Sequence, residues 1–202
     1  MTALFDRLSD LFERGHRDPV DGLMDDARLV PGQRTADAAV LIAVTERDAP
    51  GVILTQRPHT MRDHPGQVAF PGGKLEPGED VVTAALREAE EELALPRSDV
   101  RVIGTTDRFT TGTGFHITPV LGVIPPDIDL TPNPGEVAAW FEAPLELLLG
   151  RDRWTQSEVF WRGAMRQYLE MDYDGFRIWG VTAAIIANLS RRIDYAGLLA
   201  DG

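Results

Sequence analysis

One stretch of the sequence limits the fold more than any other: a loop rich in glycine and proline runs directly into an acidic helix. It extends from Gly72 to Leu95 and reads GGKLEPGEDVVTAALREAEEELAL. On a helix from Asp80 to Leu93, apolar residues recur at the i, i+3, i+4, i+7 spacing that indicates packing against a core. They are Val82, Ala85, Leu86, Ala89 and Leu93. The stretch therefore predicts a helix that covers another layer of structure.

The same helix carries four glutamates within five positions: Glu88, Glu90, Glu91 and Glu92. Glu88, Glu91 and Glu92 are expected to fall together, about opposite the apolar face. Like charges three and four residues apart repel one another, and a solvated charged face is the ordinary explanation of such a run. That explanation does not account for three carboxylates converging where only Arg87 can offset them. Because Mg²⁺ and Mn²⁺ take oxygen ligands, we interpret the cluster as a metal site.

The rest of the chain predicts a mixed sheet with helices on its faces, because strands outnumber helices and do not strictly alternate with them. An amphipathic helix opens the chain around Leu4–Phe12, and residues 16–36 form a connecting loop. Strands are predicted at 37–45, 52–57, 100–106, 115–124 and 136–143, a hairpin around Asp174-Gly175, and a buried helix at 181–193. We expect residues 1–36 to pack on one domain formed by residues 37–202.

Composition excludes several classes of protein. The chain has no cysteine, so disulfides, thiolate metal sites and a cysteine nucleophile are absent, which fits a cytoplasmic protein. No apolar run reaches the roughly 18–20 residues that span a membrane, and acids interrupt the first apolar stretch, unlike a signal peptide. A formal charge of −12 argues against binding a nucleic acid polymer. A small anionic ligand remains compatible, because a bound divalent cation reverses the local charge.

The acidic stretch resembles the signature of the Nudix hydrolases. That signature has a glycine, a glutamate six positions later, and an Arg-Glu…Glu-Glu cluster on the following helix. Here Gly73, Glu79 and the run from Arg87 to Leu95 match it. Ala94 stands where the family has glycine. The resemblance implies a Nudix-type α/β/α sandwich with a mixed β-sheet, and an enzyme that hydrolyses phosphoric anhydrides with the help of Mg²⁺ or Mn²⁺.

The resemblance also implies a role for each acidic position. Glu88 and Glu92 are expected to bind the metal, and Glu91 to be a further ligand or the base that orients water. Arg87 is expected to hold the carboxylates in place by pairing with Glu79 or Glu91. Two glycines complete the expected site: the backbone carbonyls of Gly72 and Gly73 would point toward the metal. The general base stays open between Glu91, Glu88 and a loop residue such as Glu136.

The segment from Leu54 to Gly73 narrows the substrate. It reads LTQRPHTMRDHPGQVAFPGG and resembles the additional motif of the coenzyme A diphosphatases within the Nudix family. Arg57, Arg62 and His64 supply three cationic or titratable side chains in eight residues of an acidic protein, and an arginine binds phosphate bidentately. We expect these three residues and Gly72 to contact the substrate, although each of the three has an equally plausible structural role.

Together these features predict a metal-dependent coenzyme A diphosphatase (pyrophosphatase). It would cleave coenzyme A or acyl-coenzyme A to 3′,5′-ADP and 4′-phosphopantetheine or its acyl derivative. The alternative enzyme is a Nudix pyrophosphatase that acts on ADP-ribose or another nucleoside diphosphate derivative. A non-catalytic nucleotide-binding module is the alternative from another class, but Glu79, Glu88 and the other acidic positions remain. The partner is thus a small molecule, with a homodimer left open.

Overall fold

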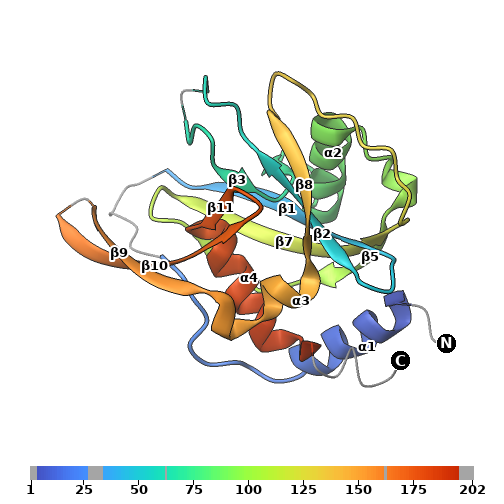
Figure 1. Cartoon of the computed structure of the whole chain (residues 1–202), viewed down its shortest axis with the longest axis horizontal. Helices are drawn as coiled ribbons and strands as arrows, with labels where there is room; N and C mark the ends of the chain where they lie inside the picture. The colour runs from blue at the N-terminus through green and yellow to red at the C-terminus, as the bar shows by residue number, and fades with distance from the viewer. Residues whose placement is uncertain (1–3, 27–33, 62, 162, 196–202) are drawn as a thin grey trace.

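The computed structural model describes residues 4–26, 34–61, 63–161 and 163–195, and Figure 1 shows their arrangement. The described helices are α1 (Leu4–His16), α2 (Val81–Leu93), α3 (Leu145–Leu149) and α4 (Val181–Arg192). The described strands are β1 (Ala36–Thr45), β2 (Gly51–Gln56), β3 (Val68–Ala69), β4 (Gly72–Lys74), β5 (Arg101–Thr105), β6 (Phe109–Thr110), β7 (Phe115–Ile124), β8 (Ala139–Pro144), β9 (Thr155–Trp161), β10 (Ala164–Tyr173) and β11 (Phe176–Trp179). Of these described helices, none is both long and apolar enough to cross a membrane.

The main sheet is mixed, as predicted. Its central order is β3-β2-β1-β7-β5, with β4 added beside β1, β6 beside β7 and β8 beside β2. β1 and β7 run parallel over ten paired positions, whereas the pairs β1–β2, β1–β4 and β2–β8 are antiparallel. The long parallel pair forms the centre of the sheet. β4, where the acidic stretch begins, is hydrogen-bonded to the first part of β1.

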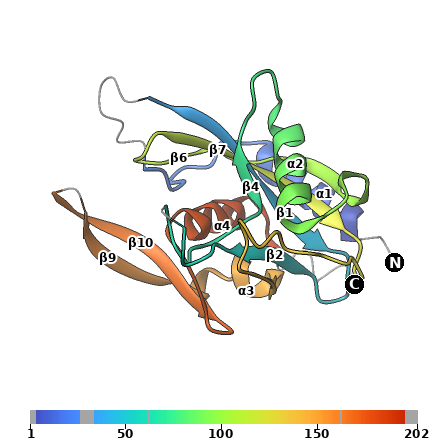
Figure 2. The ribbon, with the colours of Figure 1, turned by 90° about the horizontal axis from the view of Figure 1, so that it is seen from above.

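Alternation along the central strands produces two apolar layers. In β1, Leu41 and Ala43 face the layer that contains the alanines and Leu93 of α2. Ile42 and Val44 face the opposite layer, which contains α1 and α4. Because successive side chains of a strand point to opposite faces, one strand supports both layers. Helices therefore cover both faces of the sheet (Figures 1 and 2), which confirms the predicted fold class.

Local chemistry fixes both ends of α2. Asp80 is the N-cap, and its side chain accepts hydrogen bonds from the backbone N–H groups of Val82 and Thr83 at 3.0 and 3.1 Å. At the other end, Ala94 has φ 55° and ψ 28°, the left-handed conformation, and its N–H donates to the carbonyl of Glu90. Glycine adopts this conformation with less strain than alanine. The helix therefore ends as a glycine-terminated helix would, with alanine in the strained position.

A second sheet, β11-β10-β9, lies beside the main one. The predicted hairpin at Asp174-Gly175 is present as β10 and β11, but the sequence reading missed β9 and the short helix α3. β9 carries polar residues at most positions, so it lacks the apolar alternation that identifies a strand. It forms because it pairs with β10 over seven positions. In Figures 1 and 2 the β9–β10 hairpin extends to one side of the molecule, and Arg166 of β10 is ion-paired with Asp26 at 2.8 Å.

An ion pair joins the end of α4 to the segment between β5 and β6. The Nε and Nη2 atoms of Arg192 donate to the two carboxylate oxygens of Asp107 at 2.8 and 2.7 Å. The Nη1 atom donates to the carbonyls of Gly15 and Asp18, at 3.0 and 2.7 Å. The Arg192 side chain is 8% exposed. One buried guanidinium therefore connects α1, the segment after it, α4 and the main sheet.

Candidate active site

Three carboxylates converge at the surface of α2. Among the described residues, Glu88, Glu92 and Glu136 each offer an oxygen, and these oxygens lie within 4.8 Å of one another. Two come from α2, and the third comes from the loop before β8. Glu91 is not in the group, and its side chain is 52% exposed. The structure thus brings together two of the three helix glutamates that the sequence grouped and adds one from a distant segment.

Glu92 is the buried member of the group. The residue is 6% exposed, and its Oε2 atom has no hydrogen-bond partner among the described residues. Burial, reinforced by the negative charge of Glu88, raises the pKa of Glu92 to about 8, although the backbone N–H of Gly72 donates to the carboxylate. The expectation that Glu92 lies about opposite the core face was wrong. It borders that face, because seven residues on a helix bring it almost into line with the buried Ala85.

Arg87 fixes the other acidic side chains. Its Nε and Nη2 atoms donate to the two oxygens of Glu79 at 2.9 and 3.0 Å. Its Nη1 atom donates to Glu88 at 2.9 Å and to Glu91 at 3.1 Å, and Nη2 also reaches the carbonyl of Lys74. Arg87 therefore pairs with both of its expected partners. The pairing lowers the pKa of Glu79, whereas burial outweighs Arg87 and raises the pKa of Glu88.

Gly72 and Gly73, which precede the loop between β4 and α2, lie where a side chain does not fit. A Cβ atom on Gly73 would lie 2.2 Å from Oε1 of Glu88, and one on Gly72 would lie 2.4 Å from the carbonyl oxygen of Ala39. Gly73 therefore leaves the space that the Glu88 carboxylate fills. Gly72 allows β4 to lie against β1, where its N–H reaches Glu92.

Backbone hydrogen bonds hold the Glu136 loop against the end of α2. The N–H groups of Thr131 and Asn133 donate to the carbonyls of Leu93 and Glu92, each at 2.8 Å. The Asn133 side chain accepts from the N–H of Gly135 at 3.1 Å, and its carbonyl accepts from the N–H of Glu136 at 3.0 Å. Sequence reading proposed Glu136 only as a base, since no spacing links it to a helix more than forty residues earlier.

Arg57 follows β2 and begins the loop that leads to β3. Its charge lowers the pKa of Glu92, and its buried Nε atom has no hydrogen-bond partner among the described residues. His64 lies on the same loop, exposed, with a positive φ of 54°. Arg62, the other arginine expected to bind substrate, lies outside the described residues. Of the two described side chains, Arg57 is thus the one whose charge acts on Glu92.

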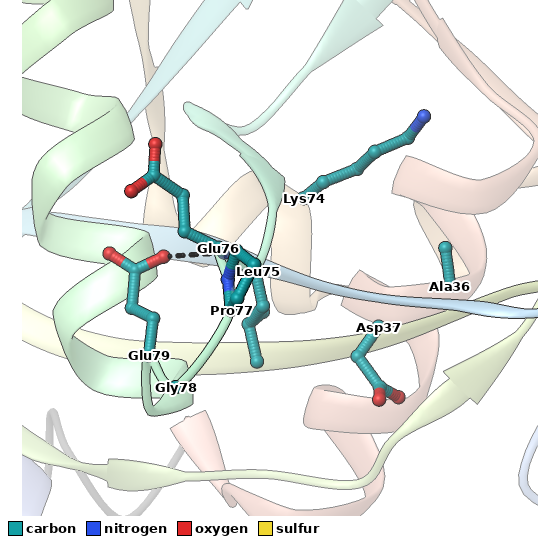
Figure 3. A pocket seen from close by; sticks show the side chains of 8 residues that line it. All are labelled: Ala36, Asp37, Lys74, Leu75, Glu76, Pro77, Gly78 and Glu79. Atoms are coloured by element: carbon teal, nitrogen blue, oxygen red, sulfur yellow. Dashed lines mark hydrogen bonds between the residues drawn. The ribbon is translucent and has the colours of Figure 1, made fainter.

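A separate pocket of about 380 Å³ lies between the start of β1 and the loop that leads from β4 to α2. It is lined by the start of β1 and by residues 74–79, and it includes none of the three converging carboxylates. In Figure 3, the Lys74 side chain points away from Glu76 and Glu79, and Glu79 accepts a hydrogen bond from the backbone of Glu76 at 2.9 Å. Because Glu79 is also bonded to Arg87, this loop is tied to α2.

The donor set of the carboxylate group fits a hard divalent cation. All three side chains present oxygens, the ligands that Mg²⁺ and Mn²⁺ prefer. The buried carboxylate of Glu92 has an oxygen without a partner, and an unpaired buried charge is costly unless a cation offsets it. The group could therefore hold a metal ion, with Glu92 as its buried ligand.

The chain is similar to known proteins of one family, the Nudix hydrolases. The family model described as the NUDIX domain matches residues 35–161. A Nudix hydrolase named NudL from Escherichia coli O7:K1 (strain IAI39) is 44% identical over 157 residues, which cover 77% of this chain and 82% of the relative. NudL of Shigella boydii serotype 4 (strain Sb227) gives the same values. The crystal structure of RenU, a Nudix hydrolase from M. smegmatis, has the same fold, with a TM-score of 0.52, 20% identity, and coverage of 84% of this chain and 92% of that one.

Proposed function

Because this chain belongs to the Nudix hydrolase family and is thus an enzyme that acts on pyrophosphates, we propose that it hydrolyses the pyrophosphate bond of coenzyme A or its acyl derivatives. The products would be 3′,5′-ADP and 4′-phosphopantetheine or its acyl derivative. The observation that carries the proposal is the carboxylate group of Glu88, Glu92 and Glu136 with Arg57 acting electrostatically on it.

Nudix hydrolases generally use divalent metal ions. Glu88 and Glu92 would hold Mg²⁺ or Mn²⁺ here. The backbone carbonyl of Gly72 would be a further ligand, because Gly72 turns its N–H toward Glu92, whereas Gly73 pairs with Ala39 in the β1–β4 ladder. When bound, such an ion neutralises charge on the phosphoryl oxygens and lowers the pKa of the attacking water. Arg87 keeps the Glu88 carboxylate in place through its 2.9 Å hydrogen bond. Glu79 acts through Arg87 as a positioning residue.

We assign the general base to Glu136. It belongs to the carboxylate group and is exposed, so water reaches it, whereas Glu92 is buried. Its carboxylate would orient the attacking water and accept its proton. Glu91 is the weaker candidate for this role, because its carboxylate is bonded to Arg87 and lies outside the group.

The preference for coenzyme A rests on the segment from Leu54 to Gly73. Coenzyme A carries a 3′-phosphate besides its pyrophosphate, so it offers one more anionic group than dephospho-coenzyme A. Arg57 has a buried donor without a partner among the described residues, and a charge-assisted hydrogen bond from arginine to phosphate would satisfy it. Arg62 and His64 belong to the same loop and are proposed as further contacts.

The test is turnover of coenzyme A, dephospho-coenzyme A and ADP-ribose, each with Mg²⁺ and with Mn²⁺. We expect the highest kcat/KM for coenzyme A. If Arg57 contacts the 3′-phosphate, Arg57→Ala should lower kcat/KM for coenzyme A about ten- to a hundred-fold more than for dephospho-coenzyme A, and Arg62→Ala is the parallel variant. A preference for ADP-ribose would replace coenzyme A with the alternative substrate, whereas no turnover of any diphosphate would contradict the catalytic assignment.

A further inference from the structure

The hairpin formed by β9 and β10 exposes apolar side chains that nothing in the site explains. We call residues 155–167 the arm. Among the described residues, the exposed large hydrophobic side chains all lie on this arm: Val159 at 43%, Phe160 at 69% and Met165 at 57% exposure. Phe160 and Met165 are directly opposite in the β9–β10 ladder, so they form a pair on one face. Exposed apolar groups gathered in one place indicate an interaction surface.

One strand of the arm, β9, has a free edge in the described structure. β9 pairs with β10 on one side and is the terminal strand of the order β11-β10-β9 in the described structure. Proteins usually protect such an edge with proline, lysine or inward charges. β9 has neither proline nor lysine, and its one charged residue is Glu158. Its outer edge is therefore suited to pairing with another strand.

From these features, we propose that the arm binds the arm of a second copy of this chain, with β9 antiparallel to β9 about a two-fold axis. An antiparallel pair of identical edges is self-complementary, so a C₂ dimer satisfies both copies at once. The two three-stranded sheets would join into one. Phe160 of each copy would pack near the axis on one face of the joined sheet, and Val159 on the other, because successive side chains of a strand point to opposite faces.

The low net charge of the arm favours contact between two copies at this place. The chain has a formal charge of −12, but residues 155–167 contain one acid and two arginines, one of which, Arg166, is paired with Asp26. Contact between two arms therefore avoids the repulsion that would oppose contact between the acidic bodies, since the hairpin lies at one side of the molecule (Figure 2). Because only the arms take part in this contact, we expect it to be smaller than the roughly 800 Å² per partner of a standard interface, and we expect the dimer to dissociate on dilution.

Sedimentation velocity between about 1 and 200 μM tests the proposal. Wild type should pass from monomer to dimer in this range, and Phe160→Asp should raise the dissociation constant about ten-fold or more, because it removes an apolar contact and adds a charge on each copy. Met165→Asp is the second variant on the same face. Ser98→Asp is the matched control: it adds the same charge at an exposed position far along the chain and should leave the dissociation constant unchanged.

A monomeric wild type at 200 μM would overturn the proposal, as would a dimer that Phe160→Asp and Met165→Asp leave intact. A monomeric wild type whose Phe160→Asp variant has a higher KM would assign the arm to substrate binding instead. Circular dichroism of each variant establishes that it is folded. The result is independent of the catalytic proposal, since the arm residues tested belong to neither the carboxylate group nor the loop after β2.

Discussion

At the scale of single residues, the candidate site depends on one carboxylate that is unfavourable without a cation. Glu92 is buried, has an oxygen without a partner among the described residues, and has a pKa raised to about 8. A protein core tolerates such a group poorly unless it is neutralised. The burial that makes Glu92 costly in the free protein is also what would make it an effective ligand for a cation.

Replacement of Glu92 by glutamine should therefore separate activity from stability. We expect Glu92→Gln to lower kcat by about 10² or more, because a lost ligand removes several kcal/mol of transition-state stabilisation. The rise in Tm that saturating Mg²⁺ gives to wild type should also shrink, since binding to the native state stabilises it. Glu90→Gln is the control, because Glu90 is exposed and pairs with Arg97. Normal turnover of Glu92→Gln at saturating Mg²⁺ would remove Glu92 from the site.

Ala94 gives a second prediction at this scale. Its left-handed backbone costs alanine about 1 kcal/mol relative to glycine, so Ala94→Gly should increase the free energy of unfolding by about that amount. The same change inside a right-handed helix should have the opposite sign, and Ala187→Gly in α4 provides that comparison. Urea denaturation measures both. A loss of stability in Ala94→Gly would show that the end of α2 does not hold Ala94 under strain.

At the scale of elements, the site is a junction between α2, β4 and the loop before β8. Arg87 ties α2 to the Gly72–Glu79 loop through Glu79 and the carbonyl of Lys74. Asn133 ties the later loop to the last turn of α2. These contacts join segments that are far apart in sequence, and they determine where the carboxylate of Glu136 lies relative to Glu88 and Glu92.

Asn133 should thus affect catalysis without touching the substrate. Asn133→Ala removes the acceptor for the N–H of Gly135, and one hydrogen bond of this kind is worth about 1 kcal/mol. We expect kcat to fall roughly five-fold and KM to change little. Asn133→Asp retains an acceptor and should restore most of the loss. If Asn133→Ala has wild-type kcat, the turn does not position Glu136.

At the scale of the whole molecule, Arg192 and Asp107 connect the N-terminal helix to the domain. The hydrogen bond from Arg192 is the largest cause that lowers the pKa of Asp107. A carboxylate whose folded pKa is depressed stabilises the fold above its unfolded pKa, near 3.8, and that contribution is lost as pH falls through the folded pKa. The pair should therefore support the fold at neutral pH and fail in acid.

Asp107→Asn should lower the free energy of unfolding at pH 7 by about 3 kcal/mol, because it leaves the buried Arg192 without its counter-charge. The difference from wild type should shrink as pH falls below about 4, because the unfolded wild type then binds a proton at Asp107 before the folded protein does. Asp152→Asn is the control, since its pair with Arg153 is widely spaced and exposed and should contribute at most about 1 kcal/mol. A difference that is constant from pH 7 to pH 3 would contradict the ionic role.

Sequence alone determined the features that depend on local pattern. The helix over most of α2, the strand at 115–124 and the hairpin at Asp174-Gly175 followed from periodicity and turn residues. The motif likewise identified Arg87 and predicted that it pairs with Glu79 or Glu91; the structure shows both contacts. These features were predictable because each depends on residues within about one helix, strand or turn of one another.

Tertiary structure alone decided the features that depend on distant segments. Glu136 joins Glu88 and Glu92 because the loop before β8 is hydrogen-bonded to the end of α2. Glu92 is buried, and Glu91 is not, because of how α2 rests on the sheet. β9 is a strand because β10 pairs with it, not because of its own side chains. Sequence spacing carries no information about such contacts, since they arise only when the chain has brought separate elements together.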